Sequence, residues 1–365
     1  MTATLADVCK ITMGQAPTGD SYNDRGEGLP LIAGAGDFKG GTLSPNKFTT
    51  KPGKVSKADD IVLSIRASIG AKVWSDGEYC LGRGVAALRP GPQLDNQYLW
   101  HWLSRYEREL ASKGRGATFL QVNKTDIGEM PIELPSLPEQ RRVAAILNYA
   151  DALRGKRIQV LAHLDILGQS IFQEMFAFGD GWASVPIGEL GQVTTGKTPP
   201  TAADGMFGGP IPFVTPGDLG SRQAVVRSVT KAGAAASRVV RRGSTFVCCI
   251  GATIGKVGAA TEPSAFNQQI NAVDWGDQID DAYGFAALKM LKPLIIARGA
   301  STTMPLLPKG QFVKIEVPVP PIDLQRAFAE RVRAIAGQRE LVFTASESDE
   351  ALFASLQSRA FRGEL

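Results

Sequence analysis

VLSIRASIGAKV at residues 62–73 recurs in shortened form as VCCIGATIGKV at residues 247–257. Aligning Gly70 with Gly255 offsets the two stretches by 185 residues. The same offset pairs residues along much of the chain: Tyr98 with Tyr283, Gly114 with Gly299, Gln140-Arg141 with Gln325-Arg326, and Phe176 with Phe361. Self-similarity over this length predicts an internal repeat, so that two copies of one module fill the chain.

Each copy begins with a segment rich in glycine, proline and short β-type runs. The copies align from their starts, with LADVCKITMGQAP at 5–17 matching IGELGQVTTGKTP at 187–199. Short apolar runs separated by glycine and proline are typical of sheet-containing globular domains. Two such domains also agree with ordinary domain sizes for a chain of 365 residues.

Each copy ends in a long apolar stripe with helical spacing. Arg157 interrupts the first stripe, and polar residues near Gln338 and at Asp349 interrupt the second. A stripe of about five heptads that occurs twice needs a long partner, and the simplest partner is the other copy. We therefore expect long helices near 137–178 and 322–362, packed antiparallel as a coiled coil. The stripe residues are Val143, Ile146, Ala150, Leu153, Val160, Leu164, Leu167 and Ile171 in the first copy, and Phe328, Val332, Ile335, Val342, Ala345, Leu352 and Leu356 in the second.

The composition is that of an ordinary globular protein. Hydrophobic residues make up 44% and charged residues 21%, and 40 Lys and Arg against 36 Asp and Glu give a net charge of +4. This mildly basic balance permits nucleic-acid binding without requiring it. The sequence has neither the pattern of a signal peptide nor an apolar run long enough to span a bilayer. We expect a cytoplasmic protein with no membrane segment.

The cysteines and histidines do not form a metal or catalytic pattern. The cysteines have neither CxxC spacing nor a disulfide framework, so buried structural thiols are expected. The two histidines are far apart in sequence and have no local partner for a zinc site or a triad. No metal ligand and no catalytic residue is therefore expected. These residues are Cys9, Cys80, Cys248, Cys249, His101 and His163.

Residues 191–198, GQVTTGKT, match the phosphate-binding loop pattern GxxxxGK[ST]. Such a loop needs a helix whose first turn faces the phosphates. Pro199 and Pro200 follow at once, which makes a helix improbable, and the first copy has no lysine in its KITMGQAP stretch. We interpret the match as a decoy, although Lys197 and Thr198 could still donate to DNA phosphates. An ATPase stays open as an alternative that a nucleotide-binding assay would test.

Three stretches resemble the specificity subunits of Type I restriction-modification systems, in an order that covers essentially the whole chain. The first is the boundary MPIELPSLPEQRRVAAIL at 130–147, whose second copy, VPVPPIDLQRAFAERV at 317–332, has Leu324 where Glu139 stands. The second is the repeated SIGAKV and TIGKV turn, and the third is the closing LFASLQSRAFRGEL at 352–365.

The resemblance implies an α+β protein with an internal two-fold repeat and no catalytic centre of its own. Two mixed α/β target-recognition domains, at 1–136 and 179–321, would be separated by conserved spacer helices at 137–178 and 322–365. The implied partners are double-stranded DNA, a methyltransferase subunit in two copies, and a restriction subunit. S-adenosylmethionine, ATP and magnesium would be bound by those subunits, which perform adenine methylation and ATP-dependent cleavage. This chain itself would need no cofactor.

Polar side chains on the glycine-rich loops are the candidate DNA contacts. Reading bases in the major groove requires donors and acceptors, with Arg and Lys favouring guanine and Asn and Gln favouring adenine. Alternatively, Ser68 and Thr253 only satisfy turn backbone, and Gln268 and Gln269 lie on a solvated strand. The candidates are Arg66, Ser68, Lys72, Arg83, Arg115, Thr118, Gln121, Asn123 and Lys124 in the first copy, and Lys197, Thr253, Lys256, Asn267, Gln268, Gln269, Arg298, Thr302, Thr303 and Lys309 in the second.

The two copies differ most before the repeated turn, which predicts two different readers and a bipartite, asymmetric target. The helices between them would set a gap of unread bases near one duplex turn, about 34 Å. The alternative from another class is a free-standing DNA-binding or regulatory protein of the same architecture. The exposed faces of the two helices would discriminate, since only a subunit of a larger enzyme needs them for partners.

Overall fold

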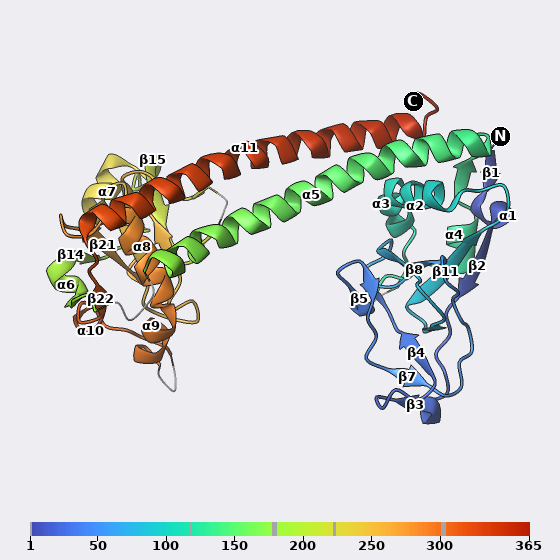
Figure 1. Ribbon diagram of the computed structural model, residues 1–365, viewed down its shortest axis with the longest axis horizontal. Coiled ribbons are helices and arrows are strands. Elements are labelled where there is room, and N and C mark those ends of the chain that lie inside the picture. Colours follow the sequence, from blue (N-terminus) through green and yellow to red (C-terminus); the bar gives the residue numbers. More distant parts are fainter. Residues whose placement is uncertain (1, 117–118, 177–180, 222–223, 301–303) are drawn as a thin grey trace. The chain divides into compact units, whose positions relative to one another are not determined.

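The computed structural model of the protein describes residues 2–116, 119–176, 181–221, 224–300 and 304–365 (Figure 1). The chain divides into two compact units. Unit 1 comprises Met1–Ile158 and Thr344–Leu365, and unit 2 comprises Gln159–Phe343. The long helices α5 (Leu137–Met175) and α11 (Ile322–Ala360) each contribute residues to both units.

The described elements follow the expected α+β pattern, in which strands dominate each unit ahead of a long helix. In unit 1 they are β1 (Thr2–Thr4), α1 (Leu5–Val8), β2 (Cys9–Met13), the 3-10 turn η1 (Gly19–Ser21), β3 (Tyr22–Asn23), β4 (Leu29–Ile32), η2 (Ala35–Asp37), β5 (Phe38–Lys39), β6 (Thr42–Leu43), β7 (Phe48–Thr49), β8 (Ile61–Ser64), β9 (Lys72–Trp74), β10 (Cys80–Leu81), β11 (Val85–Pro90), α2 (Asn96–Arg105), α3 (Glu107–Ser112), α4 (Lys124–Gly128) and β12 (Pro131–Glu133). In unit 2 they are β13 (Ser184–Pro186), α6 (Ile187–Leu190), β14 (Gly191–Thr195), β15 (Phe207–Val214), β16 (Ser228–Val229), α7 (Lys231–Ala236), β17 (Val239–Val240), β18 (Thr245–Cys248), β19 (Val257–Ala259), β20 (Ser264–Phe266), β21 (Ile270–Trp275), α8 (Asp281–Met290), α9 (Lys292–Arg298), α10 (Lys309–Phe312) and β22 (Glu316–Pro318).

Unit 1 is built on a four-stranded antiparallel sheet with strand order β2-β11-β8-β9. All four residues of β8 are buried because both faces of the strand are covered. Ile61 and Leu63 belong to the cluster that contains Trp102 of α2, whereas Val62 belongs to a second cluster with Ile32 of β4. Because successive side chains of a strand point to opposite faces, β8 contacts both the helical and the sheet-rich part of this unit.

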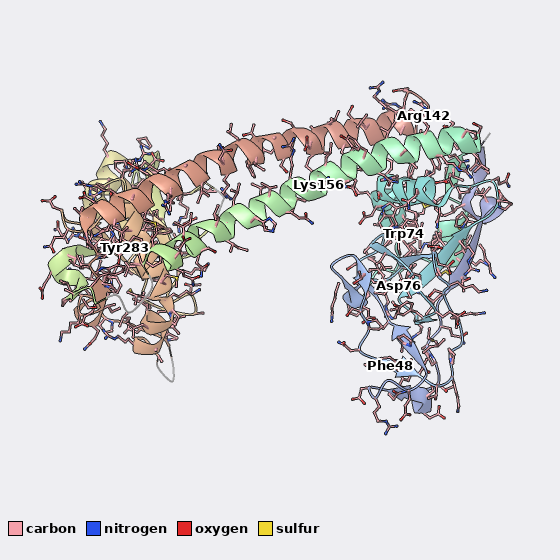
Figure 2. All side chains as sticks on the ribbon, in the orientation of Figure 1. Phe48, Trp74, Asp76, Arg142, Lys156 and Tyr283 are labelled. Atoms are coloured by element: carbon pink, nitrogen blue, oxygen red, sulfur yellow. The ribbon has the colours of Figure 1, made fainter. Side chains whose placement is uncertain are left out.

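Unit 2 is built on a four-stranded antiparallel sheet with strand order β14-β21-β18-β19. The residues of β18 are again all buried. Val247 belongs to the cluster that contains Tyr283 of α8 (labelled in Figure 2), whereas Phe246 belongs to a cluster with Phe266 of β20. The cores of both units therefore depend on one central strand that is apolar on both faces.

The start of each long helix is tied to its unit by a fully buried glutamine. Gln140 accepts a hydrogen bond from the Asp95 N–H at 2.8 Å, and its amide donates to the carbonyls of Gln93 and Pro135 at 3.0 Å. In unit 2, Gln325 makes the corresponding bonds; its partners are the Asp280 N–H and the carbonyls of Gln278 and Pro320. Neither glutamine has any exposed surface.

The helices expected near 137–178 and 322–362 are present, each ending a few residues early, and within each unit they contact one another. In unit 1, Arg154 of α5 bonds Glu350 of α11 at 2.6 Å. In unit 2, Arg339 of α11 bonds Asp165 of α5 at 2.8 Å. The apolar stripes are only partly buried, since Leu153 is 40% exposed, and Val160 and Leu167 are similarly exposed. None of the described helices is long and apolar enough to cross a membrane.

Candidate nucleic-acid interface

Three candidate residues of unit 1 are brought together where a loop closes over the end of β8. Arg66 pairs with Gln121 through a backbone bridge, and Gln121 exchanges two backbone hydrogen bonds of 3.0 Å with Arg115. All three side chains are exposed. Main-chain bonds thus fix the loop and leave the Arg66 guanidinium and the Gln121 amide exposed to a ligand, which suits recognition of phosphates and base edges.

The turn that carries Ser68 is held by an unusual backbone conformation. Ala67 has a φ of 60° in unit 1, and Gly251 has a φ of 86° at the matching place in unit 2. Ala67 N–H donates to the Leu120 carbonyl at 2.9 Å, which ties the turn to the neighbouring loop. A non-glycine residue with positive φ is uncommon and is frequently associated with functional sites. Ser68 is exposed next to it.

Arg83, Asn123 and Lys124 lie on neighbouring segments. Arg83 is exposed beside Gly84, whose carbonyl accepts the Ile65 N–H at 2.9 Å, so the segment adjoins the loop of Arg66. The Asn123 side chain caps α4 by accepting the Asp126 N–H at 2.9 Å, and Lys124 begins that helix. Asp126 also pairs with Arg115 at 3.1 Å. The side-chain carbonyl oxygen of Asn123 therefore already accepts a hydrogen bond, whereas Lys124 and Arg83 are exposed.

Lys72 is directed into unit 1. Its ammonium lies 4.5 Å from the ring centre of Trp100 and donates to Ser104 Oγ at 2.7 Å. Burial lowers the pKa of Lys72 to about 8, and the nearby Glu107 and Asp151 carboxylates oppose this shift. Trp100 in turn stacks on Trp74 at 4.7 Å between ring centres. These contacts leave Lys72 less accessible than the other candidates of its unit.

In unit 2, a second group of candidates gathers where the segments after β14 and β20 meet. Lys197 N–H donates to the Phe266 carbonyl at 3.0 Å, and Thr198 Oγ1 donates to Gln268 Oε1 at 2.6 Å. Asn267 and Gln269 bond each other through their side chains and backbone at 3.1 Å. Lys197 and Gln268 are exposed. The segment of Lys197 and Thr198 and the amide-rich segment after β20 thus meet in one cluster.

The remaining described candidates of unit 2 have local partners. Thr253 Oγ1 lies 3.3 Å from Cys248 Sγ, and Lys256 Nζ donates to the Pro216 carbonyl at 3.5 Å; both residues are half-buried. Arg298, at the end of α9, donates to the Lys314 carbonyl at 3.4 Å. Lys309 is exposed at the start of α10. The candidates Thr118, Thr302 and Thr303 lie outside the described residues.

The decoy interpretation of GQVTTGKT agrees with the backbone. Residues 191–195 form β14, and 196–200 are neither helix nor strand. The next element is β15, which begins at Phe207. The helix that must directly follow the lysine of a phosphate-binding loop is therefore not formed in residues 196–206.

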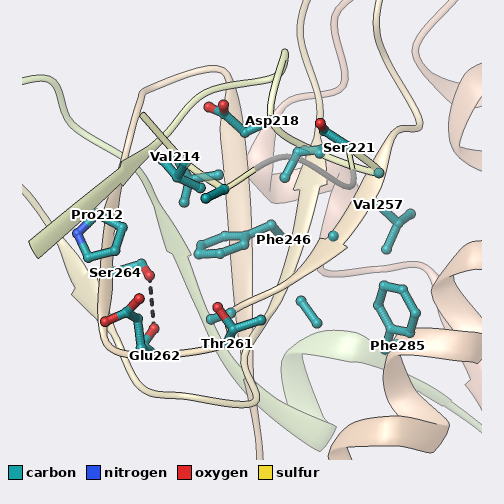
Figure 3. A pocket seen from close by; sticks show the side chains of 17 residues that line it. Pro212, Val214, Asp218, Ser221, Phe246, Val257, Thr261, Glu262, Ser264 and Phe285 are labelled. Carbon is teal, nitrogen blue, oxygen red and sulfur yellow. Dashed lines mark hydrogen bonds between the residues drawn. The ribbon is translucent and has the colours of Figure 1, made fainter. Parts of the chain in front are cut away.

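A cavity of about 370 Å³ lies in unit 2, beside Phe246 (Figure 3). Its charged lining groups are Asp218, whose carboxylate accepts from Thr215 N and Oγ1 at 2.7 Å, and Glu262. The described lining residues include no lysine or arginine. Across the described part of the chain, no group of three or more His, Cys, Asp or Glu residues could hold a metal ion. The four cysteines are buried free thiols, as expected.

Sequence reasoning missed one feature of both loops. Large apolar side chains are exposed beside the polar candidates: Phe119 and Leu120 in unit 1 are 56% and 49% exposed, and Met304 and Leu306 in unit 2 are 56% and 44% exposed. The signal was present in GRGATFLQVNK, where two apolar residues interrupt a polar loop. The choice of candidates by hydrogen-bonding capacity left these apolar residues out.

A family model described as the Type I restriction modification DNA specificity domain matches residues 1–163 and 179–341. Among curated proteins, the putative type I restriction enzyme MjaX specificity subunit of Methanocaldococcus jannaschii is 37% identical over 147 residues, which are 40% of this chain and 34% of that protein. The type I restriction enzyme HindI specificity subunit of Haemophilus influenzae is 30% identical over 219 residues, 57% of this chain and 46% of that protein. The matched region spans less than half the length of either relative.

Two solved structures share the fold. The Type-I restriction-modification S subunit from M. genitalium matches with a TM-score of 0.64 and 16% identity, over 99% of this chain and 96% of that one. A chain from a study of complex assembly and conformational transition in the type I R-M system matches with a TM-score of 0.65 and 19% identity, over 100% and 98%. At these identities the likeness concerns the fold.

Proposed function

Because this chain belongs to the family of the Type I restriction-modification DNA specificity domain, we propose that it reads the DNA target of a Type I restriction-modification enzyme. The observation that carries the proposal is that each unit exposes cations and amides on segments held by main-chain hydrogen bonds. In unit 1 these are Arg66, Arg115 and Gln121 on the loop at the end of β8, and in unit 2 they are Lys197 and Gln268 on the segments that follow β14 and β20. Exposed cations and amides on a rigid frame are what major-groove reading requires.

We infer that the two units are copies of one module and that each reads its own half-site. The equal strand orders of the two main sheets and the matching bonds of Gln140 and Gln325 support this. The target-recognition domains would be residues 1–136 and 179–321. The loops carry different side chains at matching places, for example Arg66 in unit 1 and Ile250 in unit 2. The target would therefore be bipartite and asymmetric, and the candidates that face solvent would be its contacts.

The spacer between the two domains would be an antiparallel coiled coil of residues 137–178 and 322–365. In unit 1 the first half of α5 bonds the second half of α11, and in unit 2 the second half of α5 bonds the first half of α11. This order of contacts supports an antiparallel pair. Its length would fix the number of unread bases between the half-sites.

Catalysis would belong to partner subunits, which are two methyltransferase subunits and a restriction subunit that hold S-adenosylmethionine, ATP and magnesium. The long helices expose large apolar side chains that a partner could cover. The most exposed are Tyr149 (71%), Ile158 (58%) and Leu352 (56%) in unit 1, and Ile166 (60%) and Leu341 (67%) in unit 2. A free-standing DNA-binding protein would gain nothing from this surface, which favours the subunit over that alternative.

A domain exchange tests the proposal. Residues 1–136 are replaced by the matching domain of a relative, and methylation by the reconstituted enzyme is measured on a library of sites. Only one half of the methylated sequence should change, because the base contacts lie in the exchanged domain. A change in both halves, or methyl transfer by the isolated chain, would contradict the proposal.

A further inference from the structure

Each unit exposes large apolar side chains at matching positions of the loop that bridges to the turn after its central strand. Phe119 and Leu120 precede Gln121, which bridges to Arg66; Met304 lies two residues before Leu306, which bridges to Ile250. A single exposed apolar residue is ordinary, but the same placement in both units is not explained by chance exposure.

The backbone beneath these side chains is fixed. In unit 1 the Leu120 carbonyl accepts the Ala67 N–H at 2.9 Å, and the Val122 N–H donates to the Ile65 carbonyl at 3.0 Å. In unit 2 the corresponding bonds measure 2.8 Å; they join Gly251 N–H to the Pro305 carbonyl and Leu307 N–H to the Cys249 carbonyl. The exposed residues are therefore presented by an anchored frame, which lowers the entropy cost of inserting them into a ligand.

The charges around the loop of unit 1 indicate what it contacts. The Arg66 guanidinium lies 5.5 Å from the ring centre of Phe119, and the exposed Arg115 pairs with Gln121 in the same loop. The cores of protein–protein interfaces are depleted in charge, whereas an apolar side chain beside an exposed guanidinium suits a base stack flanked by phosphates. Phe119 and its neighbours thus combine a stacking face with phosphate contacts.

We propose that Phe119 in unit 1 and Met304 in unit 2 act as wedges that insert against a base step of their half-sites and partly unstack it. This inference rests on the proposed DNA-reading function and adds a specificity-determining contact to it. Because pyrimidine–purine steps unstack most easily, each wedge would favour such a step without any hydrogen bond to the bases.

The test uses the chain assembled with its cognate methyltransferase subunits and duplexes that carry 2-aminopurine at successive positions of each half-site. This adenine analogue brightens when it is unstacked, and the probe is kept away from the methylated adenine, which is itself flipped out. The wild-type complex should brighten at one step in each half-site. Phe119→Ala should abolish the signal in one half-site and weaken binding by about 5- to 150-fold. Phe119→Trp should keep the signal, and Met304→Ala should abolish the signal of the other half-site only.

Three outcomes would overturn the wedge. The first is a Phe119→Ala complex that binds and brightens like the wild type. The second is failure of Phe119→Ala to co-elute with the methyltransferase subunits, which would make the loop a protein contact. The third is a wild-type complex with no sequence preference, which would overturn the proposed function as well, whereas the first two overturn the wedge alone. Because Phe119 is exposed, the thermal midpoint of Phe119→Ala should match that of the wild type.

Discussion

Arg157 of α5 donates its Nε–H to the carboxylate of Asp349 on α11, so the two charged residues that interrupt the apolar stripes are paired with each other in unit 1. In the sequence, each is a charged residue within an otherwise apolar helical stripe. In the structure they form one contact, with side-chain exposures of 39% and 21%. Their neighbours Arg154 and Glu350 form a second pair at 2.6 Å. Charge pairing thus replaces apolar packing at this level of the two helices.

Removing one member of the pair should cost more than removing both. Arg157→Leu leaves Asp349 without this partner and should lower the unfolding free energy by about 1 kcal/mol, or roughly 2–4 °C in the thermal midpoint. The double variant Arg157→Leu/Asp349→Leu should recover the wild-type midpoint, since apolar residues can replace a half-buried ion pair. Arg362→Leu is the control, because its partner Glu364 lies in the exposed chain end. A double variant less stable than the single would contradict this account.

Gln140 should be among the most sensitive polar residues of unit 1. Gln140→Ala removes three hydrogen bonds, and the Asp95 N–H and the carbonyls of Gln93 and Pro135 lose this partner. Because Gln93 is exposed and Asp95 and Pro135 are half-buried, water can satisfy part of these groups, and we expect a loss of about 1–3 kcal/mol. Gln140→Glu keeps the acceptor but places a buried carboxylate against two carbonyl oxygens, so it should also be destabilising. Urea unfolding measures both, with the exposed neighbour Arg141→Ala as the control. Equal stability of Gln140→Ala and wild type would show that the hydrogen bonds of Gln140 do not stabilise unit 1.

The sequence predicted the long helices and the sheet-containing segments because these depend on local periodicity and on the repeat itself. The pairing of Gln140 with Gln325 at an offset of 185 residues was visible in the same way. Their function was not, because a buried glutamine that bonds three backbone groups depends on chain segments that only folding brings together. The partners of Gln140 lie up to 47 residues away.

The candidate site was predicted less completely than the fold. The cluster of Lys197, Thr198 and Gln268 joins segments 70 residues apart, and no local pattern encodes that approach. Lys72 shows what the sequence alone does not reveal, since a lysine in a glycine-rich turn reads as exposed, whereas Trp100 of a distant helix covers it. Composition therefore located the loops, but burial decided which of their side chains remain accessible.

Lys72 should make the stability of unit 1 depend on pH. Burial lowers its pKa to about 8 from 10.5 in the unfolded chain. Between these values the unfolded chain binds a proton that the folded chain does not, so wild-type stability should rise with pH across this window. Below about pH 8 the penalty of the buried ammonium is fully present. Lys72→Met removes this group, and its stability relative to wild type should fall as the pH rises from 8 to 10.5. Thermal unfolding over this range measures the difference, and a constant difference would contradict the lowered pKa.

Lys197 should contact phosphate in DNA and not in ATP. The segment after β14 is neither helix nor strand, so Lys197 lacks the helix N-terminus that a nucleotide site requires. Its exposed ammonium lies in the cluster with Thr198 and Gln268, where a DNA backbone could pass. Lys197→Ala should therefore leave the ATP affinity of the assembled enzyme unchanged. It should weaken DNA binding similarly for all sequences and reduce the slope of log K against log salt by about 1. Gln268→Ala is the matched comparison, since loss of a base contact should instead relax one position of the target by about 1–3 kcal/mol. Filter binding across a salt series and ATP titration separate these effects, and a loss of ATP affinity in Lys197→Ala would show that GQVTTGKT is a nucleotide site after all.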